Sequence, residues 1–502
     1  MTAKNTLQTL IDQTKETAVL QSIEELLNWD QRTQMPAKAA NYRAEQITLL
    51  SGMIHQRTVD PRRGQYLTEL AEEVSSQSDH DGDVIVLRLL KQYEKEKKIP
   101  LRLVEEFSKA RVMAHQAWVD ARKANRFSDF APHLETIVKL LREKTDAIGF
   151  QESAYDVLLD DYEPNTKSSD VASVFSALKA DLVPLISEIG ESSCRPDSSI
   201  IRRPFPIADQ QTFGTSAAKA IGFDFEAGRL DITHHPFCCT VGPKDCRITT
   251  RYDKNYFNSA FFGILHEAGH GLYEQGLRAD QFGLPTGEYC SLGIHESQSR
   301  LWENMVGRSK SFWKHFFPLA QNSFPQALAN VPLDHFFGAV NDVKPSLIRV
   351  EADEATYSLH VIIRFELEQA LFTGDLQVND LPAAWNQKYQ QALGIHPDSD
   401  SNGVLQDVHW SEGLFGYFPT YALGNLYAAQ FFDSAANAIG DLDLQIAKGE
   451  FVPLLNWLRS NVHQKGKPLS ASDILQSATG ESLSHQPMMT YLREKYAEIY
   501  SL

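Results

Sequence analysis

Apolar residues recur at three- and four-residue intervals through much of this 502-residue chain. The pattern is clear in segments 7–30, 101–125 and 134–150, where charged residues fill the intervening positions and no proline interrupts the run. This spacing places the apolar side chains on one face of an α-helix, and that face must pack against another element. The sequence therefore predicts a mainly α-helical fold whose helices face a buried core.

Segment 229–253 departs from the helical pattern. Ile232, Val241 and Ile248 lie on either side of a Gly242-Pro243 turn, in the arrangement typical of two short strands. We expect these strands to pair as a small β-hairpin or sheet. Its exposed edge would allow an extended peptide to add as another strand.

The strongest functional signal is the pattern H-E-x-x-H, formed by His266, Glu267 and His270. Residues four apart share one face of a helix, so a single metal ion can bind both imidazoles. The apolar run before the motif and Gly276 after it are consistent with a helix here. Zinc held by three protein groups retains a water molecule whose pKa is about 7, and Glu267 is placed to act as its general base.

A third metal ligand is expected from the next helical run, which begins near His295. If a glycine- and proline-containing loop reverses the chain, this second helix lies antiparallel to the first and presents Glu296 to the histidine pair. His295 is the rival ligand. Two histidines and a glutamate match the thermolysin-type zinc site. Glu274, four residues after His270, either supports that histidine from behind or is a solvated helix charge.

Composition narrows the function classes. The chain has 48 basic and 65 acidic residues, and its formal net charge of −17 argues against nucleic-acid or membrane partners. The first twenty residues lack the apolar core of a signal peptide, and no run of apolar residues is long enough to span a membrane. Five cysteines are too few and too irregular for a disulfide framework. We therefore expect a cytoplasmic protein with reduced thiols, in which residues 1–502 form a single catalytic domain.

Several ordered motifs together resemble the carboxypeptidase Taq family of metallocarboxypeptidases. They are HPF at 235–237, D-x-R-x-T at 245–249, HEAGH at 266–270, HESQSR at 295–300, IRVEAD at 348–353 and GVLQDVHW at 403–410. Further likeness at 28–36 and 158–165 extends the resemblance over most of the chain. It implies a neurolysin-like helical fold with two lobes around a deep central groove, usually as a homodimer.

The resemblance also implies an activity and a ligand set. The family removes single residues from the free carboxyl terminus of a peptide substrate with the help of a divalent metal, Zn²⁺ first and Co²⁺ or Mn²⁺ as alternatives. It assigns the metal to His266, His270 and Glu296, and the general base to Glu267. These are the four residues that spacing had already indicated.

Further residues of the family motifs are candidates for substrate binding. Arg349 is our first choice to bind the terminal carboxylate, because a guanidinium can grip both of its oxygens. Arg247 competes for that role, or else pairs with Asp245 to hold the hairpin. His235, beside the hairpin, is a further candidate for substrate contact. Three more candidates are able to donate a hydrogen bond to the oxyanion, or else pack in the interior: His409, Tyr417 and Tyr421.

Two other functions are compatible with parts of the sequence. An oligopeptidase or endopeptidase would use the same H-E-x-x-H chemistry without needing a free carboxylate. A helical binding protein with a vestigial metal site would lack hydrolysis altogether, but Glu267 and all three ligands are intact. The preferred C-terminal residue, the physiological metal and the choice between Arg349 and Arg247 are not determined by the sequence.

Overall fold

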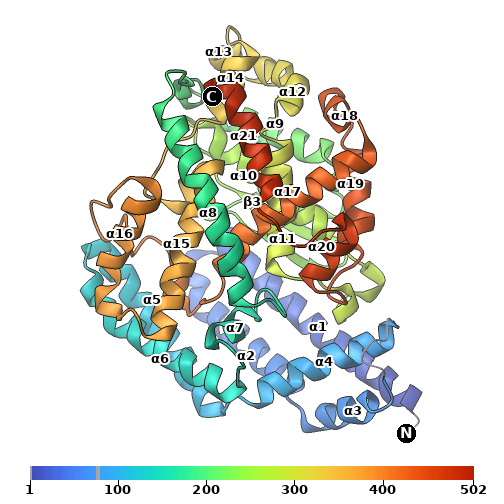
Figure 1. Cartoon of the computed structure of the whole chain (residues 1–502). Helices are drawn as coiled ribbons and strands as arrows, with labels where there is room; N and C mark the ends of the chain where they lie inside the picture. Colours follow the sequence, from blue (N-terminus) through green and yellow to red (C-terminus); the bar gives the residue numbers. More distant parts are fainter. Residues whose placement is uncertain (1–2, 75–79) are drawn as a thin grey trace. The chain divides into compact units, whose positions relative to one another are not determined.

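The computed structural model of the chain describes residues 3–74 and 80–502. It is mainly α-helical with a small three-stranded sheet, which confirms the predicted fold class (Figure 1). The chain divides into two compact units of three segments each. Unit 1 comprises 1–97, 197–340 and 431–482, and unit 2 comprises 98–196, 341–430 and 483–502. The single catalytic domain expected for residues 1–502 stays a prediction.

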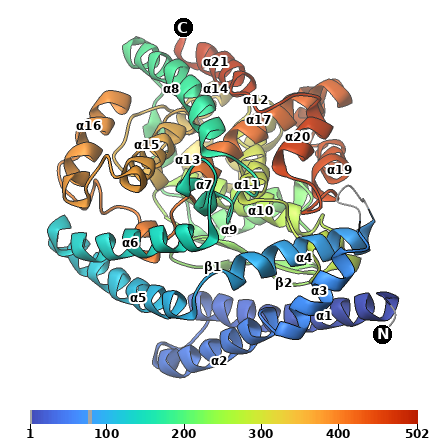
Figure 2. The same ribbon diagram turned by 60° about the horizontal axis from the view of Figure 1, so that its bottom comes forward.

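Unit 1 begins with two pairs of packed helices, drawn in blue in Figure 1 and Figure 2. The apolar face expected in segment 7–30 contributes Leu10 to a buried cluster with Leu67, Ile85 and Leu89. The predicted apolar face is buried only in part, because Val19, Ile23 and Leu26 of the same segment are exposed. The four helices are α1 (Ala3–Thr33), α2 (Ala40–Thr58), α3 (Pro61–Ala71) and α4 (Asp81–Lys97).

The sheet of unit 1 contains the predicted hairpin and one more strand. Its strands are β1 (Gly228–Ile232), β2 (Cys238–Gly242) and β3 (Asp245–Thr250), in the spatial order β1-β3-β2. β2 and β3 form the antiparallel hairpin, whereas β1 pairs with β3 in parallel, so that Leu230 lies opposite Ile248. The sulfur atoms of Cys238 and Cys246 are 3.6 Å apart, well beyond the roughly 2.05 Å of a disulfide.

The remaining helices of unit 1 surround α10, which follows the sheet. Aromatic side chains fill the space between α10, α9 and α12: Phe257 and Phe261 of α10 stack 5.1 Å apart, and Phe213 of α9 stacks on Phe261 at 5.2 Å. These contacts fix α10 in the interior. The helices are α9 (Ile207–Ala220), α10 (Phe257–Glu274), α11 (Leu292–Arg300), α12 (Lys310–Ser323), α13 (Pro325–Leu328), α14 (Leu333–Val340), α18 (Leu442–Lys448), α19 (Val452–Leu458) and α20 (Ala471–Thr479).

Unit 2 is built from helices that include the other two predicted amphipathic segments, now α5 and α6. Tyr155, Phe175 and Phe365 lie in its core with edge-to-face ring contacts. Helix α17 (Pro419–Ile439) starts in unit 2, and its residues after Gln430 belong to unit 1. The helices are α5 (Leu101–Ala124), α6 (Ala131–Ile148), α7 (Ala154–Leu159), α8 (Ser168–Glu191), α15 (Glu354–Thr373), α16 (Leu381–Leu393) and α21 (Gln486–Tyr500).

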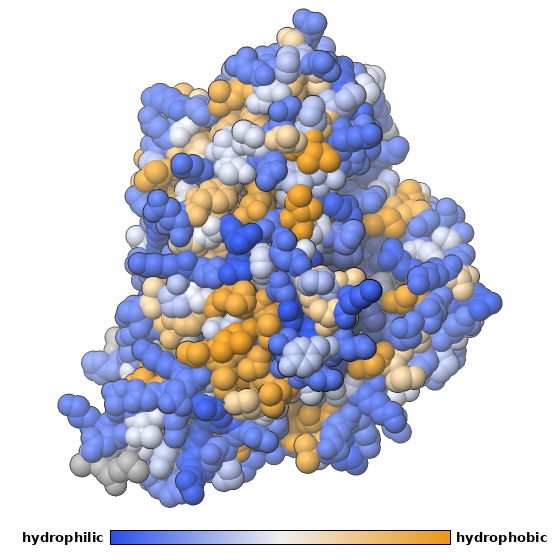
Figure 3. Space-filling model, turned by 180° about the vertical axis from the view of Figure 1, so that it is seen from behind, coloured by the Kyte–Doolittle hydropathy of each residue, from blue (hydrophilic) through white to orange (hydrophobic). Residues whose placement is uncertain are grey.

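The face of the molecule seen from behind the view of Figure 1 is mostly hydrophilic. Figure 3 shows a face on which hydrophilic residues predominate and apolar residues gather in smaller areas. Among the helices of 3–74 and 80–502, none has the length and apolar character needed to cross a membrane.

Candidate metal centre

Helix α10 carries both histidines of the H-E-x-x-H motif. Its apolar residues Phe261 and Leu265 are buried, and the helix ends at Glu274, in agreement with the sequence pattern. His266 and His270 lie one turn apart on the same helix face, with ring centroids 4.9 Å apart. The packing of α10 therefore holds both imidazoles in place.

Helix α11 presents the third candidate ligand. Its start is fixed by Ser291, whose hydroxyl accepts a hydrogen bond from the Ile294 backbone N–H at 3.1 Å. Serine is a favoured residue at this capping position. The cap starts the helix at Leu292, three residues before the predicted position. One turn later, Glu296 is buried against α10, with 5% of its surface exposed.

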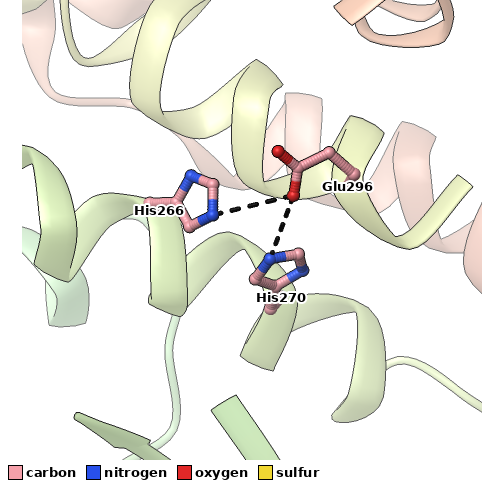
Figure 4. Close-up of side chains that lie close together, drawn as sticks. All are labelled: His266, His270 and Glu296. Carbon is pink, nitrogen blue, oxygen red and sulfur yellow. Dashed lines mark ion pairs between the residues drawn. The ribbon is translucent and has the colours of Figure 1, made fainter. Parts of the chain in front are cut away.

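The structure brings His266, His270 and Glu296 together (Figure 4). Glu296 Oε2 lies 3.3 Å from His270 Nε2 and 3.7 Å from His266 Nε2. Metal–ligand bonds of about 2.1 Å in a tetrahedron separate neighbouring ligand atoms by roughly 3.4 Å. Both the donor types and their spacing therefore fit a zinc-like divalent ion.

Neighbouring groups decide which oxygen of Glu296 faces the histidines. Arg300 Nε donates to Glu296 Oε1 at 2.6 Å, and the Ser299 hydroxyl donates to Oε2 at 3.0 Å. Burial raises the pKa of Glu296, but Arg300 and His266 oppose this and hold the pKa well below its usual range. Glu296 is thus an ionised carboxylate that offers a single oxygen, Oε2, to the metal position.

Glu303 is a component of the site that sequence reasoning missed. Its Oε2 lies 2.9 Å from His266 Nδ1, the ring nitrogen turned away from Glu296. Burial raises the pKa of Glu303, yet Arg300 and His266 bring it down to about 2. Glu303 lies in a π-helical turn, Leu301–Val306, a type of distortion that is common at functional sites. The available signal was its position two turns after Glu296 in the same helical run.

Glu267 has the properties that a general base requires. It is next to a metal-ligand candidate and is 6% exposed. Burial raises its pKa to about 7, although His266 opposes the rise, and the carboxylates of Glu296 and Glu303 add to it. A carboxylate with a pKa near neutrality can both accept and return a proton at physiological pH.

The rival ligand His295 lies behind His270. Its Nδ1 is 2.6 Å from His270 Nδ1, the nitrogen that does not face Glu296. Its Nε2 is 2.8 Å from Glu274 Oε1. His295 and Glu274 are therefore connected to His270 from the side opposite the metal position.

The hairpin candidates of unit 1 lie along the sheet: Asp245 and Arg247 belong to β3, with Asp245 at the hairpin turn, and His235 lies in the connection at the opposite end. Arg247 donates from Nε and Nη2 to the two oxygens of Asp245, each at 2.8 Å, and its guanidinium lies 4.3 Å from the ring centroid of Trp29. This is the hairpin-holding arrangement that we considered as the alternative to substrate binding. His235, in the connection between β1 and β2, is exposed.

The other candidates gather in unit 2 around Asp407. Arg349, which is 4% exposed, donates from Nε and Nη2 to Asp407 Oδ1 at 3.1 and 2.8 Å. His409 Nε2 lies 3.3 Å from the Tyr421 hydroxyl, and the ring of Tyr417 is 5.4 Å from that of Tyr421. Burial lowers the pKa of His409 to about 3, although Asp407 opposes the shift. The cluster combines a neutral imidazole, phenol hydroxyls and a paired cation.

Known proteins resemble this chain over nearly its whole length. Residues 9–496 match the family described as carboxypeptidase Taq (M32) metallopeptidase. The chain is 45% identical to thermostable carboxypeptidase 1 of Thermus thermophilus, with 100% of both chains covered. It is 40% identical to carboxypeptidase 1 of Bacillus subtilis, with 95% of each covered.

Solved structures give the same result for the fold. The crystal structure of the M32 carboxypeptidase from Deinococcus radiodurans has a TM-score of 0.96 at 40% identity, covering 99% of this chain and 100% of that one. A carboxypeptidase structure from Pyrococcus furiosus has a TM-score of 0.94 at 31% identity, covering 98% and 99%. The chain therefore belongs to the carboxypeptidase Taq (M32) family of metallopeptidases and is a metallocarboxypeptidase.

Proposed function

We propose that His266, His270 and Glu296 bind one divalent metal ion, most suitably Zn²⁺, and that Glu267 is the general base of peptide hydrolysis. The observation that carries this proposal is the approach of Glu296 Oε2 to both imidazoles, at 3.3 and 3.7 Å. A bound metal of this kind polarises the scissile carbonyl and lowers the pKa of water to about 7. Imidazole and carboxylate ligands also accept Co²⁺ and Mn²⁺.

The chain's own groups then have separate roles. Glu267 accepts the proton of the attacking water and returns it to the leaving amine. Arg300 fixes the orientation of Glu296 by occupying Oε1. Glu303 accepts a hydrogen bond from His266 Nδ1, which leaves the Nε2 lone pair of His266 directed at the metal position.

We propose that the substrate is a peptide with a free C-terminal carboxylate, from which single residues are released. The donors His409, Tyr417 and Tyr421 are the proposed contacts for the peptide carbonyl, and His235 is a further proposed contact. For the terminal carboxylate, Arg349 and Arg247 both stay candidates. Arg349 already donates to Asp407, and Arg247 already donates to Asp245. The arginine that binds the terminal carboxylate must therefore do so with N–H groups that its aspartate does not occupy.

A pair of matched peptides tests the direction of cleavage. The same sequence is supplied with a free C-terminus and with a C-terminal amide, and products are timed by mass spectrometry. We expect stepwise loss of C-terminal residues from the free peptide and strong protection of the amide. Internal cleavage of both peptides at equal rates would contradict the proposal and favour an oligopeptidase.

The same assay separates the two arginines. Loss of the arginine that binds the terminal carboxylate should abolish the difference in cleavage rate between the free and the amidated peptide. That difference arises from the guanidinium–carboxylate contact. Arg349→Lys and Arg247→Lys are therefore compared by the ratio of kcat/KM for the two peptides, with Arg62→Lys at an exposed position as the control. A structural arginine lowers both rates and leaves the ratio unchanged. If neither variant changes the ratio, both assignments are wrong.

A further inference from the structure

A continuous chain of polar contacts runs from His270 to the sheet. His270 Nδ1 lies 2.6 Å from His295 Nδ1 and 3.1 Å from the His295 backbone oxygen. His295 Nε2 is 2.8 Å from Glu274 Oε1, and the Thr240 hydroxyl of β2 donates to Glu274 Oε2 at 2.9 Å. The side chains of His270, His295 and Glu274 are each 16% exposed or less. This series of polar contacts is therefore largely shielded from water, which would otherwise compete for them.

The contacts are compatible with one placement of protons for neutral imidazoles. An ionised Glu274 only accepts, so His295 carries its proton on Nε2 and donates it to Glu274. His295 Nδ1 then has a lone pair and accepts the proton of His270 Nδ1. This leaves His270 Nε2 unprotonated and facing Glu296 Oε2, as a metal ligand must be.

The geometry also explains the choice between the two candidate ligands on α11. Glu274 follows His270 by one helical turn, so both lie on one face of α10, and His295 contacts both. Its neighbour Glu296 is rotated by one residue toward the Nε2 atoms. His266 is supported differently, because its Nδ1 contacts the carboxylate of Glu303 directly.

We infer that His295 is a positioning residue that fixes the tautomer and ring orientation of His270, and that Glu274 and Thr240 anchor His295 to strand β2. The inference deepens the proposed function, because it presupposes that His270 binds the metal. Groups of this kind change metal affinity by about 10- to 100-fold when they are removed. The expected effect is therefore on metal binding itself and does not require a turnover measurement.

Two nearly isosteric substitutions separate the two ends of His295. In His295→Asn, the side-chain oxygen takes the approximate place of Nδ1 and can accept from His270. In His295→Gln, the amide reaches toward Glu274 but leaves His270 with the backbone oxygen alone. His295→Phe removes both functions. His335→Phe, at an exposed position of the same unit, is the control.

The measurement is the Zn²⁺ dissociation constant of the full-length apoprotein, obtained by competition with a chromophoric chelator. The visible absorption of the Co²⁺ form reports ligand geometry. We expect the Phe and Gln variants to bind Zn²⁺ about 10- to 100-fold more weakly with altered Co²⁺ spectra, and the Asn variant to stay within a few-fold of the parent. Wild-type affinity in the Phe and Gln variants would overturn the inference, since the backbone oxygen would then suffice.

Glu274→Gln tests the same series of polar contacts without changing His295. We expect several-fold weaker Zn²⁺ binding, because the charge that holds the His295 proton is lost. Unchanged binding in this variant would overturn the anchoring role of Glu274 and Thr240. If the parent chain itself binds no metal at this site, the proposed function fails. If the parent binds and every variant binds equally, only the inference about His295 fails.

Discussion

Burial of a carboxylate has different consequences in this protein according to the charge of its partners. Glu303 faces Arg300 and has a pKa of about 2 despite burial. Glu303 has 12% of its side chain exposed, whereas Glu368 in unit 2 is fully buried. The Glu368 carboxylate accepts from neutral groups, the Tyr155 hydroxyl, the Trp410 indole and the Gly416 N–H. Burial outweighs these donors and raises the pKa of Glu368 to about 7. The charge of the nearest partners is the main difference between the two residues.

This difference predicts a pH effect on stability. The pKa of Glu368 is raised from 4.5 to about 7, so its contribution to stability is present below pH 4.5 and is lost as the pH rises through 7. Glu368→Gln cannot ionise, so its stability relative to the parent should increase by up to about 3 kcal/mol between pH 5 and 8. Urea unfolding at both pH values measures the change. Parallel pH dependence of the two proteins would refute the prediction.

For Glu267, the proposed general base, the ability to ionise bears on turnover. Glu267→Gln keeps the size of the side chain but removes its capacity to accept a proton. We expect kcat to fall by about 10²- to 10⁴-fold while the metal content stays at that of the parent. Glu72→Gln, at an exposed position of unit 1, is the control. Peptide hydrolysis and elemental analysis measure the two quantities, and normal turnover would remove Glu267 from its assigned role.

At the scale of secondary structure, the proposed metal site depends on how closely α10 and α11 approach. The two helices run antiparallel, because His270 contacts His295 while His266, one turn earlier, contacts the later residue Glu303. Gly269 lies where they meet. A Cβ atom there would come within 2.5 Å of the Gln298 carbonyl oxygen. Gly269 of the HEAGH motif is therefore needed because only a residue without a Cβ atom lets α11 pack this closely.

Gly269→Ala should accordingly weaken metal binding. The new methyl group meets backbone atoms of α11, which cannot rotate away, so α11 and Glu296 must move. We expect a loss of about 1–3 kcal/mol in stability and a measurably higher Zn²⁺ dissociation constant. Gly263→Ala on the same helix is the matched control, because its Cβ would lie 3.5 Å from the Thr250 hydroxyl. Equal Zn²⁺ affinities for the two variants would contradict this account.

The elements also show where local patterns were sufficient. The amphipathic segments became α1, α5 and α6, and the Gly242-Pro243 turn joins the two hairpin strands. Strand β1 was not foreseen, because its parallel pairing with β3 depends on a segment that is not joined to β3 by a tight turn. Helix α11, expected to start near His295, starts at Leu292 because the Ser291 side chain caps it there.

At the scale of the whole molecule, neither unit is a continuous stretch of chain. Each combines an early, a middle and a late segment, and helix α17 contributes residues to both. Unit 1 contains the metal-site candidates, and unit 2 contains Arg349 and its aromatic neighbours. Long-range contacts, which sequence periodicity does not encode, therefore determine the membership of each unit.

We propose that two copies of the chain associate in solution, as the family resemblance implies, and that the protein is cytoplasmic, as its few cysteines suggest. Light scattering after size-exclusion chromatography should give a mass twice the 56.5 kDa of one chain. The measurement is made over a range of protein concentrations, because dimers dissociate on dilution. A mass of one chain at every concentration would exclude the dimer.

The sequence by itself predicted the helical class, the hairpin, the histidine pair as metal-ligand candidates and Glu267 as the candidate general base, because each depends on spacing within one or two adjacent elements. Only the tertiary structure decided what the remaining charged residues do. It placed Glu303 on His266 and His295 behind His270, and it paired Arg349 and Arg247 with aspartates. These roles depend on which way a side chain points once helices pack, and periodicity specifies the face of a helix but not the partner across from it.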